Sequence, residues 1–459
     1  MKMNIDKKIM FPIIGGITLL VGLLVLFGLH NTNEEISTSK LEATVLSASA
    51  EMVMVQDKDN VIYTFEVQGI DECSSGNVLL EYTGILNKNI EVQNVSVINC
   101  NVVTTDNDTG MPEAWQDNGI FSNYYTLAYN QMKKLTLDEK IAQILLVRYP
   151  DTNGATVLKN YQFGGYVFFE KDFSGKTKAE VKEMISNLQD QANIPILTAV
   201  DEEGGKVVRV SSNTNLADSK FASPSTLYKE GGFPLIKEDT ITKSALLKSL
   251  GLNLNLAPVV DVTTDSSAYM YDRTLQENTE LTSTYAKTVI EASKGTGVSY
   301  TLKHFPGYGN NTDTHIGSAT DTRSYDEIFA NDIPPFEAGI NAGAEAVLVS
   351  HNIVKGIDGD NPASLSPSIH NLLRNQLDFT GIIITDDISM SALNSISDIA
   401  VKAILAGNDL IISTDYITDI RDIKNAINNG TLSEEMIDKL AMRVIAWKYY
   451  KGLMFENQK

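Results

Sequence analysis

Cysteine is scarce in this chain: its 459 residues include only Cys73 and Cys100. A metal cluster built from cysteines is therefore excluded, because such a site takes several thiolates. The two cysteines lie within one short segment, so they either form a disulfide or remain two separate thiols. The sequence leaves both alternatives open.

Basic side chains are outnumbered by acidic ones. There are 37 Lys and Arg against 58 Asp and Glu, which gives a formal charge of −21 and a pI near 4.7. Nucleic acids and anionic bilayer surfaces favour Lys and Arg, so we expect neither to bind across a broad face of this protein. A hydrophobic fraction of 43% over this length is enough for one large domain with additional parts.

The motifs of common metal and nucleotide sites are also missing. His304, His315 and His351 are possible ligands by residue type, but no H-x-H or H-E-x-x-H pattern is present. Gly164-Gly165 and Gly204-Gly205 have neither the G-x-G-x-x-G spacing of a dinucleotide loop nor the GK[ST] of a P-loop. We therefore expect no metal and no nucleotide cofactor.

One long apolar run is present near the N-terminus. Residues 9–29 carry no charge over 21 positions, which is long enough for a helix to cross a bilayer. Lysines precede this run and glutamates follow it, so the positive-inside rule places residues 1–8 in the cytoplasm and the rest of the chain outside. The sequence thus predicts a single-pass membrane protein, attached to the membrane by this transmembrane helix. A cleaved signal peptide is the alternative, although no small-x-small cleavage site closely follows the run.

Two further parts precede the largest region. From residue 41 to 103, short runs such as "NVIYTFEV" and "NVLLEYTG" alternate apolar and polar residues, which predicts a small all-β module. We favour a spacer role for this module, with glycan or partner binding as the alternative. Residues 104–119 are polar and rich in turn formers, and are predicted to be a linker.

Residues 120–459 alternate apolar strand candidates with amphipathic helical stretches. Continuous Val, Ile and Leu runs indicate strands that are buried on both faces, as in a parallel sheet. Eight β/α units predict an α/β fold, a (β/α)8 TIM-type barrel preceded by the transmembrane helix and the small all-β module. An open, doubly wound sheet is the alternative for the barrel. The eight strand candidates begin at residues 142, 164, 195, 252, 298, 344, 381 and 408.

Polar residues end almost every strand candidate. In barrel enzymes the carboxyl ends of the strands form the active site, so these side chains are expected to meet at one mouth. Their convergence predicts an enzyme. The residues are Asp201, Glu202, Glu203, Asp261, Lys303, His304, Ser350, His351, Asp386, Asp387 and Asp415.

Two stretches carry groups suited to glycoside hydrolysis, which needs a carboxylate at the sugar C1 and a second group that protonates the leaving oxygen. In "TDDISM" neighbouring strand residues point to opposite faces, so one aspartate can enter the mouth, and we choose Asp386. The alternative is that both aspartates cap the following segment. Asp313 lies two residues before His315, close enough to orient the imidazole for proton transfer; a solvated loop histidine is the alternative.

These stretches resemble a known family. From about Leu135 to Lys451 the chain is similar to the β-N-acetylhexosaminidases of glycoside hydrolase family 3. Their signature resembles K-H-[FI]-P-G-x-G followed by D-[ST]-H, found here as "KHFPGYG" from Lys303 and "DTH" from Asp313. Further similar stretches follow the family order: "VDEEGGKVVR", "NLAPVVDV", "DRTL", "VSHNIV" and "TDDISM".

The resemblance implies a retaining exo-β-N-acetylglucosaminidase of about residues 120–459 that acts on peptidoglycan fragments or related glycans. It implies that Asp386 is a nucleophile that forms a covalent glycosyl-enzyme, and that His315, oriented by Asp313, is the acid/base. The partner is then a carbohydrate substrate, with no cofactor. The residues that the resemblance assigns to sugar binding are Asp201, Arg209, Arg273, Lys303 and His304.

Some positions depart from the family pattern. The spacer "NNT" before Asp313 is one residue shorter than the commonest form, Tyr308 stands where His or Leu is frequent, and "DRTLQ" replaces the usual Arg-Ser-Phe-Gly. These departures concern leaving-group preference and rate more than reaction type. Two alternatives remain open: a β-N-acetylglucosaminide phosphorylase, since a neutral histidine does not repel phosphate, and a non-catalytic glycan-binding barrel.

Overall fold

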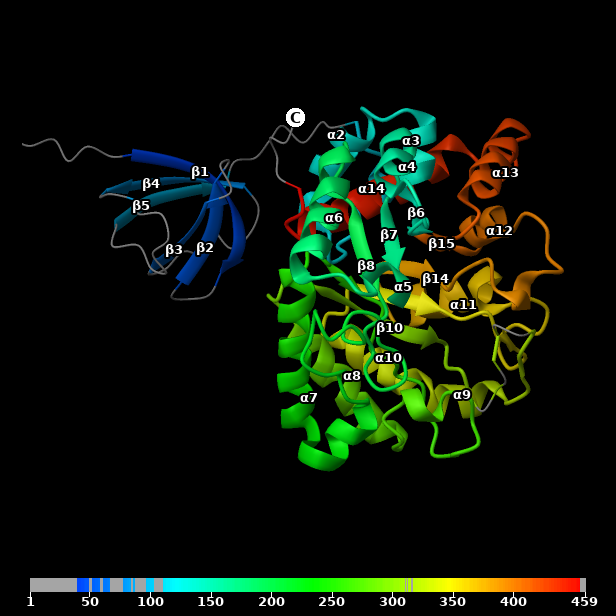
Figure 1. Cartoon of the computed structure of the whole chain (residues 1–459). Helices are drawn as coiled ribbons and strands as arrows, with labels where there is room; N and C mark the ends of the chain where they lie inside the picture. Colours follow the sequence, from blue (N-terminus) through cyan, green and yellow to red (C-terminus); the bar gives the residue numbers. More distant parts are fainter. Residues whose placement is uncertain are drawn as a thin grey trace, which may run out of the picture. The chain divides into compact units, whose positions relative to one another are not determined.

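The computed structural model describes residues 39–48, 52–57, 61–66, 77–83, 86, 96–102 and 110–454, apart from 310, 312, 315 and 316. The chain divides into two compact units, Met1–Thr104 and Thr105–Lys459, and each is described by itself. Figure 1 shows the elements of both units.

The first unit contains one antiparallel sheet in the order β3-β2-β1-β4-β5. Alternate side chains of the central strands are buried, as the period of two in the sequence predicts. They form a small core of their own that includes Val55, Phe65 and Leu80. Cys73 and the side chain of Cys100 lie outside what the structure describes. The strands are β1 (Ser39–Ala48), β2 (Met52–Asp57), β3 (Ile62–Glu66), β4 (Asn77–Thr83) and β5 (Ser96–Val102).

The predicted transmembrane helix, residues 9–29, lies outside the described residues. Among the helices that are described, none has both the length and the apolar character that crossing a bilayer requires. The longest of them, α7 (Pro224–Ser249), carries Lys, Glu and Asp side chains along its 26 residues. The predicted fold class is therefore wrong in its transmembrane helix, and the predicted single-pass membrane localisation is wrong with it. Over the described ranges the fold is a barrel and an antiparallel sheet, without a spanning helix.

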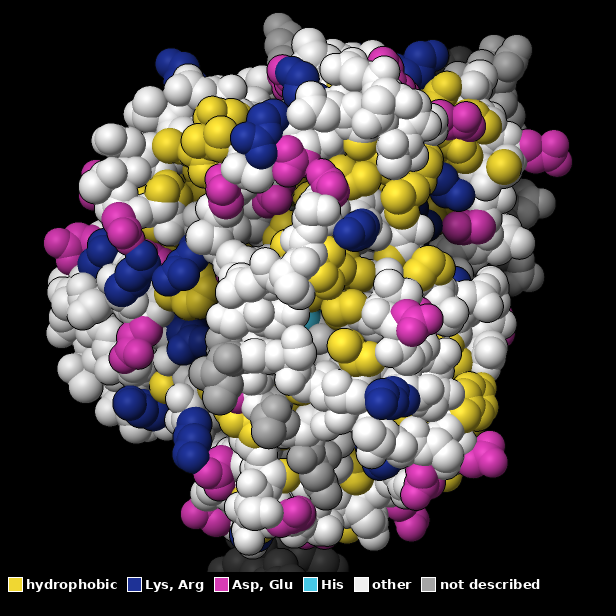
Figure 2. Space-filling model, turned by 90° about the vertical axis from the view of Figure 1, so that its right-hand side faces the viewer, with side chains coloured by type: hydrophobic (Ala, Val, Ile, Leu, Met, Phe, Trp, Pro, Cys, Tyr) yellow, Lys and Arg dark blue, Asp and Glu magenta, His cyan; other side chains and the backbone are white. Residues whose placement is uncertain are grey.

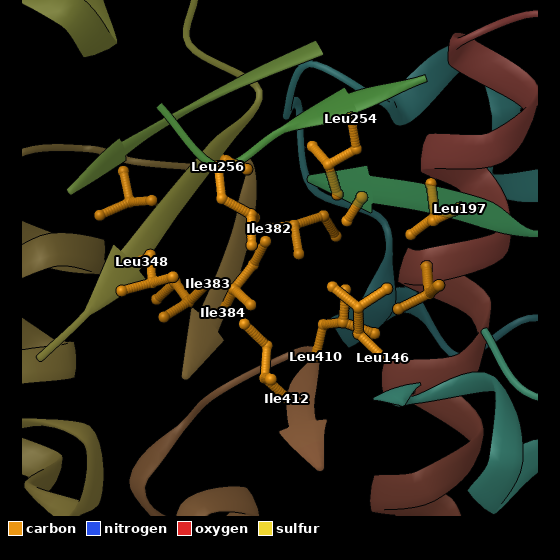
Figure 3. Packing of buried hydrophobic residues seen from close by; sticks show 14 of the residues in the cluster. Leu146, Leu197, Leu254, Leu256, Leu348, Ile382, Ile383, Ile384, Leu410 and Ile412 are labelled. Atoms are coloured by element: carbon orange, nitrogen blue, oxygen red, sulfur yellow. The ribbon is translucent and has the colours of Figure 1, made fainter. Parts of the chain in front are cut away.

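The second unit is built on eight parallel strands in the order β14-β12-β10-β9-β8-β7-β6-β15. Each strand falls within one of the eight strand candidates. Their side chains pack together in a continuous hydrophobic core, in which Leu146, Leu254, Leu348 and Ile382 come from four different strands (Figure 3). The strands are β6 (Leu145–Arg148), β7 (Gly165–Phe168), β8 (Leu197–Val200), β9 (Leu254–Asn255), β10 (Ser299–Phe305), β12 (Ala346–Val349), β14 (Ile382–Thr385) and β15 (Ile411–Ser413).

The sheet closes on itself where its first and last strands meet. Ile384 of β14 forms a parallel bridge with Leu410, just before β15. The backbone N–H of Thr385 donates to the Leu410 carbonyl at 3.1 Å, and the Ile388 N–H donates to the Ile412 carbonyl at 3.1 Å. An open sheet would leave both edges unpaired, so the doubly wound alternative does not apply.

Helices follow the strands and surround the barrel (Figure 1). Several begin at the capping box that the sequence signature S/T-x-x-E predicts, including α3 at Thr136, α6 at Thr177 and α9 at Ser324. A small parallel pair, β11 (Thr320–Asp321) and β13 (Ile353–Val354), lies outside the barrel sheet. The other helices are α2 (Tyr125–Met132), α3 (Leu137–Gln143), α4 (Gly154–Tyr161), α5 (Glu170–Phe173), α6 (Lys178–Gln191), α8 (Thr279–Ser293), α9 (Tyr325–Asn331), α10 (Ile333–Asn341), α11 (Pro367–Asn371), α12 (Ile399–Ala406), α13 (Tyr416–Asn428) and α14 (Glu434–Tyr450).

The last helix, α14, covers the amino ends of several barrel strands. Arg443 donates to the Gly381 carbonyl, just before β14, at 2.9 Å. Lys451, which follows the helix, donates to the Asn253 carbonyl, just before β9, at 2.7 Å. Lys448 is fully buried and donates to the side-chain oxygen of Gln143, just before β6, at 2.7 Å. This end of the barrel is therefore filled by side chains, and the opposite end is left for a site.

Lys448 is expected to make stability depend on pH. Burial lowers the pKa of its ammonium from 10.5 to about 7. Between these two values the unfolded state binds more protons, so the free energy of unfolding rises with pH. Lys448→Met should remove this rise of the free energy of unfolding with pH. The free energy of unfolding of the variant, minus that of wild type, should therefore be larger at pH 7 than at about pH 9. Thermal melts at the two pH values measure this, and an equal difference at both would contradict it.

Candidate active site

A cavity of about 680 Å³ lies at the carboxyl ends of the barrel strands. Figure 2 shows one face of the molecule with a hollow near its centre and a histidine side chain at the base of that hollow. The cavity is lined by seven of the eight residues predicted from the sequence to form the site; His315 lies outside the described residues. These seven residues are Asp201, Arg209, Arg273, Lys303, His304, Asp313 and Asp386.

Lys303 is the centre of an ion-pair cluster at the base of this cavity. It lies near the end of β10, whose pairing with β12 is irregular between Leu302 and Phe305, and such an irregularity re-aims side chains. Its ammonium is 2.8 Å from an Asp201 oxygen and 2.7 Å from a Glu203 oxygen. Burial works against the charged ammonium, but these carboxylates outweigh it and raise the pKa of Lys303.

Arg273 extends the cluster on the other side of Glu203. Its Nε and Nη2 donate to the two Glu203 oxygens at 2.9 and 2.7 Å, which is the bidentate geometry of a strong pair. Burial acts to raise the pKa of the Glu203 carboxyl, yet Arg273 and Lys303 together hold that pKa well below its usual range. Glu203 thus fixes two cations that the resemblance assigns to sugar binding.

His304 is oriented by Asp261. Its ring Nδ1 is 2.8 Å from Asp261 Oδ2, and because a carboxylate can only accept, this nitrogen carries the proton. The other ring nitrogen, Nε2, then accepts from Arg273 Nη2 at 3.4 Å. His304, at 5% exposed, is consequently held in one tautomer at the cavity wall.

Asp386 follows β14 and has part of its surface open to the cavity. Burial acts to raise the pKa of its carboxyl, but favourable interactions, those with His351, the N–H of Asp387 and Lys303 among them, outweigh that effect. The pKa of Asp386 is therefore below its ordinary value, and the group is ionised at neutral pH. The Asp387 carboxylate instead accepts from Ser389 N–H at 2.9 Å and from the Thr414 hydroxyl at 3.0 Å. Both aspartates line the cavity, so they differ in their hydrogen-bond partners and not, as strand alternation predicts, in which of them reaches the mouth.

Aromatic and basic side chains form the wall near β6 and β7. The Arg148 guanidinium lies 4.3 Å from the centre of the Phe169 ring, and that of Arg209 lies 5.6 Å from it. The Nη2 of Arg209 is also 3.8 Å from Asp201 Oδ2, whereas Lys303 contacts the other oxygen of that carboxylate, Oδ1. At the rim, Lys206 pairs with Asp272.

The loop after β10 carries the second predicted pair. Asp313 and Thr314 line the cavity, while His315 lies outside the described residues, so the contact between Asp313 and His315 stays a prediction. Gly307 has φ +120°, and a Cβ there would be 2.5 Å from Asp332. Only glycine fits such a position, which lets the chain turn over the cavity.

Sequence reasoning missed the organising role of three groups. Glu203 and Asp261 were expected at the mouth as strand-end residues, but not as the carboxylates that fix Lys303, Arg273 and His304. His351, which bears on the ionisation of Asp386, was likewise known only by position. Contacts between residues that are far apart in the chain leave no pattern in the local sequence. No three His, Cys, Asp or Glu side chains gather as a metal site within the described part of the chain.

The chain is similar to known proteins in both sequence and structure. The family model "Glycosyl hydrolase family 3 N terminal domain" matches residues 136–447. A β-hexosaminidase from Xanthomonas campestris pv. campestris (strain B100) is 32% identical over 247 residues, which are 53% of this chain and 73% of that protein.

Solved structures agree with this family. A glycoside hydrolase family 3 β-N-acetylglucosaminidase from a Paenibacillus species superposes with a TM-score of 0.65 at 27% identity, over 70% of this chain and 63% of that chain. A β-N-acetylhexosaminidase from Beutenbergia cavernae superposes with a TM-score of 0.60 at 26% identity, over 69% of this chain and 99% of that chain. With a family model that spans most of the second unit, the chain belongs to glycosyl hydrolase family 3, in its β-hexosaminidase group.

Proposed function

We propose that this enzyme removes a terminal β-linked N-acetylglucosamine from its substrate with retention of configuration. The observation that carries the proposal is an ionised Asp386 in the same cavity as the Lys303, Asp201 and Arg273 cluster. A carboxylate that stays charged at neutral pH is suited to attack an anomeric carbon. The hydrolase class itself follows from the family.

In the first step, Asp386 attacks the sugar C1 and the bond from C1 to the leaving oxygen breaks. His315, with Asp313 as its partner, gives a proton to that oxygen. A covalent glycosyl-aspartate results. In the second step His315 takes a proton from water, the water oxygen attacks C1, and the Asp386 carboxylate is released. These roles rest on the family resemblance of "TDDISM" and "DTH".

The sugar-binding residues suit a sugar that offers both donors and acceptors. Asp201 accepts hydrogen bonds, whereas Lys303, Arg273 and Arg209 only donate. All of them already lie in ion pairs, so a sugar hydroxyl would meet groups whose positions are fixed. Peptidoglycan fragments and related glycans with terminal N-acetylglucosamine are the proposed substrates.

The test is turnover of a chromogenic β-N-acetylglucosaminide, with the product followed by NMR. We expect release of the β-anomer of free N-acetylglucosamine at first, before mutarotation. Initial release of the α-anomer would contradict retention. Assays with and without phosphate separate hydrolysis from phosphorolysis: a sugar 1-phosphate as main product would replace the hydrolase by a phosphorylase. Sugar binding without turnover over a range of pH would indicate a non-catalytic barrel.

A further inference from the structure

Tyr308 is one of the positions where this chain departs from the family pattern, and the mechanism above gives it no role. It lies between Gly307 and Gly309, both at positive φ, and it is only 2% exposed. Its ring packs near His304, with ring centres 5.6 Å apart, and near Tyr269, at 5.8 Å. Tyr308 therefore belongs to the loop that carries Asp313, and its ring packs near the sugar-binding residue His304.

The hydroxyl of Tyr308 contacts Thr314 in two ways. It accepts from the backbone N–H of Thr314 at 2.9 Å, and it lies 2.8 Å from the Thr314 hydroxyl. Burial raises the pKa of the Tyr308 hydroxyl, so the group stays protonated and can donate as well as accept. Thr314 is 1% exposed, so neither bond is replaced easily by water.

The backbone of Tyr308 is fixed from the opposite side. Its N–H donates to Asp261 Oδ1 at 2.7 Å, while the other oxygen of the same carboxylate holds His304. Its carbonyl accepts from Asn352 at 3.3 Å and from Asn311 at 2.9 Å. The hydroxyl of Tyr308 therefore extends from a backbone that is itself tied to the sugar-binding wall.

Thr314 is also held at its carbonyl, which accepts from the Ala392 N–H at 3.2 Å. Its amide, hydroxyl and carbonyl groups are thus all engaged, two of them by one tyrosine hydroxyl. Thr314 is the residue between Asp313 and His315 in the chain. Whatever fixes Thr314 limits where its two neighbours can be.

We propose that the Tyr308 hydroxyl is a positioning group. It holds Thr314, and thereby places the neighbouring residues Asp313 and His315 for proton transfer to the leaving oxygen. This inference rests on the proposed function, because it assumes that these two residues are the acid/base pair.

The alternative is that Tyr308 only fills space beside Val259 and Met270, with which it forms a small buried cluster. Tyr308→Phe separates the two roles, since it keeps the ring and removes only the hydroxyl. Tyr166→Phe is the matched control: Tyr166 is equally buried, and its hydroxyl donates to the Gly154 carbonyl at 3.0 Å, away from the cavity.

The experiment compares two glycosides with purified full chains. A phenyl β-N-acetylglucosaminide needs protonation of its leaving oxygen, and a 2,4-dinitrophenyl β-N-acetylglucosaminide does not. For Tyr308→Phe we expect kcat/KM to fall by about 10- to 100-fold with the phenyl glycoside and by no more than about 3-fold with the dinitrophenyl glycoside. Tyr166→Phe should show no such difference between the two glycosides.

Hydrogen exchange gives a second readout that does not need turnover. In Tyr308→Phe the Thr314 amide loses its acceptor, so the peptide that contains it should exchange faster, and Tyr166→Phe should leave that peptide unchanged. Equal kcat/KM losses for both glycosides, or unchanged exchange, would overturn the positioning role. A wild type that turns over neither glycoside would overturn the proposed function, and exchange would still decide whether Tyr308 holds Thr314.

Discussion

Asp386→Asn should lower kcat by on the order of 10⁴-fold or more, because the amide cannot form the glycosyl ester that the proposed mechanism requires. The carboxyl pKa of Asp386 is below its ordinary value, so the wild-type group is ionised at neutral pH, as the proposed nucleophile has to be. The loss should therefore persist at every pH where the wild type works. Steady-state rates with a β-N-acetylglucosaminide, measured across pH, provide the comparison.

The neighbouring aspartate supplies the matched control. The Asp387 carboxylate accepts hydrogen bonds from Ser389 and Thr414, which hold the loop after β14. Asp387→Asn weakens these bonds and should lower kcat by at most about 10-fold. Asp386→Ala with added azide is the complementary test, since a small anion can enter the space left by the carboxylate. We expect azide to restore glycoside cleavage with a glycosyl azide as product. Comparable losses for the two asparagine variants would reject Asp386 as nucleophile.

Glu203→Gln should damage both stability and substrate binding. The substitution removes the carboxylate that Lys303 and Arg273 share and leaves two cations in a buried cluster. Loss of one partner from a buried ion pair typically costs about 3–5 kcal/mol in the free energy of unfolding. We expect a fall of several degrees in the unfolding temperature and a rise in KM of about 10-fold or more, because both cations are proposed sugar ligands.

The pH dependence of this effect has a definite sign. The pKa of Glu203 is held below its unfolded value of 4.5, so its contribution to stability is present above that pH and is lost as the pH falls further. The stability difference between wild type and Glu203→Gln should therefore narrow in acid. Lys206→Gln, which breaks only the exposed pair with Asp272 at the rim, is the control and should change the unfolding temperature little. A Glu203→Gln variant as stable as this control would show that the cluster does not support the fold.

The barrel strands could be predicted because each is a short apolar run followed by polar residues, as in "GIIITDDIS". The polar end of that strand also placed Asp386 at the cavity, but Asp387 lines the cavity too, so alternation along the strand does not separate the two. The structure adds that β14 is paired next to β15, which closes the barrel. The periodicity of the sequence does not predict this closure. The expectation of a membrane-spanning helix rested on the same hydropathy reasoning, and no described helix meets it.

The ion-pair cluster could not be predicted, because its members come from separate parts of the chain. Glu203, Arg273 and Lys303 meet only when the segments after β8 and before α8 close over the end of β10. Asp261 shows the same limit: its two oxygens bind His304 and Tyr308, and neither contact leaves a pattern in sequence. Residue type indicated which side chains were reactive, whereas the fold alone determined their partners.

Two hydrogen bonds join the loop after β10 to the loop after β14 that begins with Asp386: the Ala392 N–H donates to the Thr314 carbonyl, and the Ser318 hydroxyl donates to the Ala392 carbonyl. The loop that follows the proposed nucleophile is thus bonded to the residue next to the proposed proton donor. If one of these loops were replaced by that of a relative, the hydrogen bonds between them would be expected to be lost. Replacing residues 306–319 and 388–394 as a pair would keep the two loops matched. In this chain, a change in one of these two loops is therefore expected to act on the other.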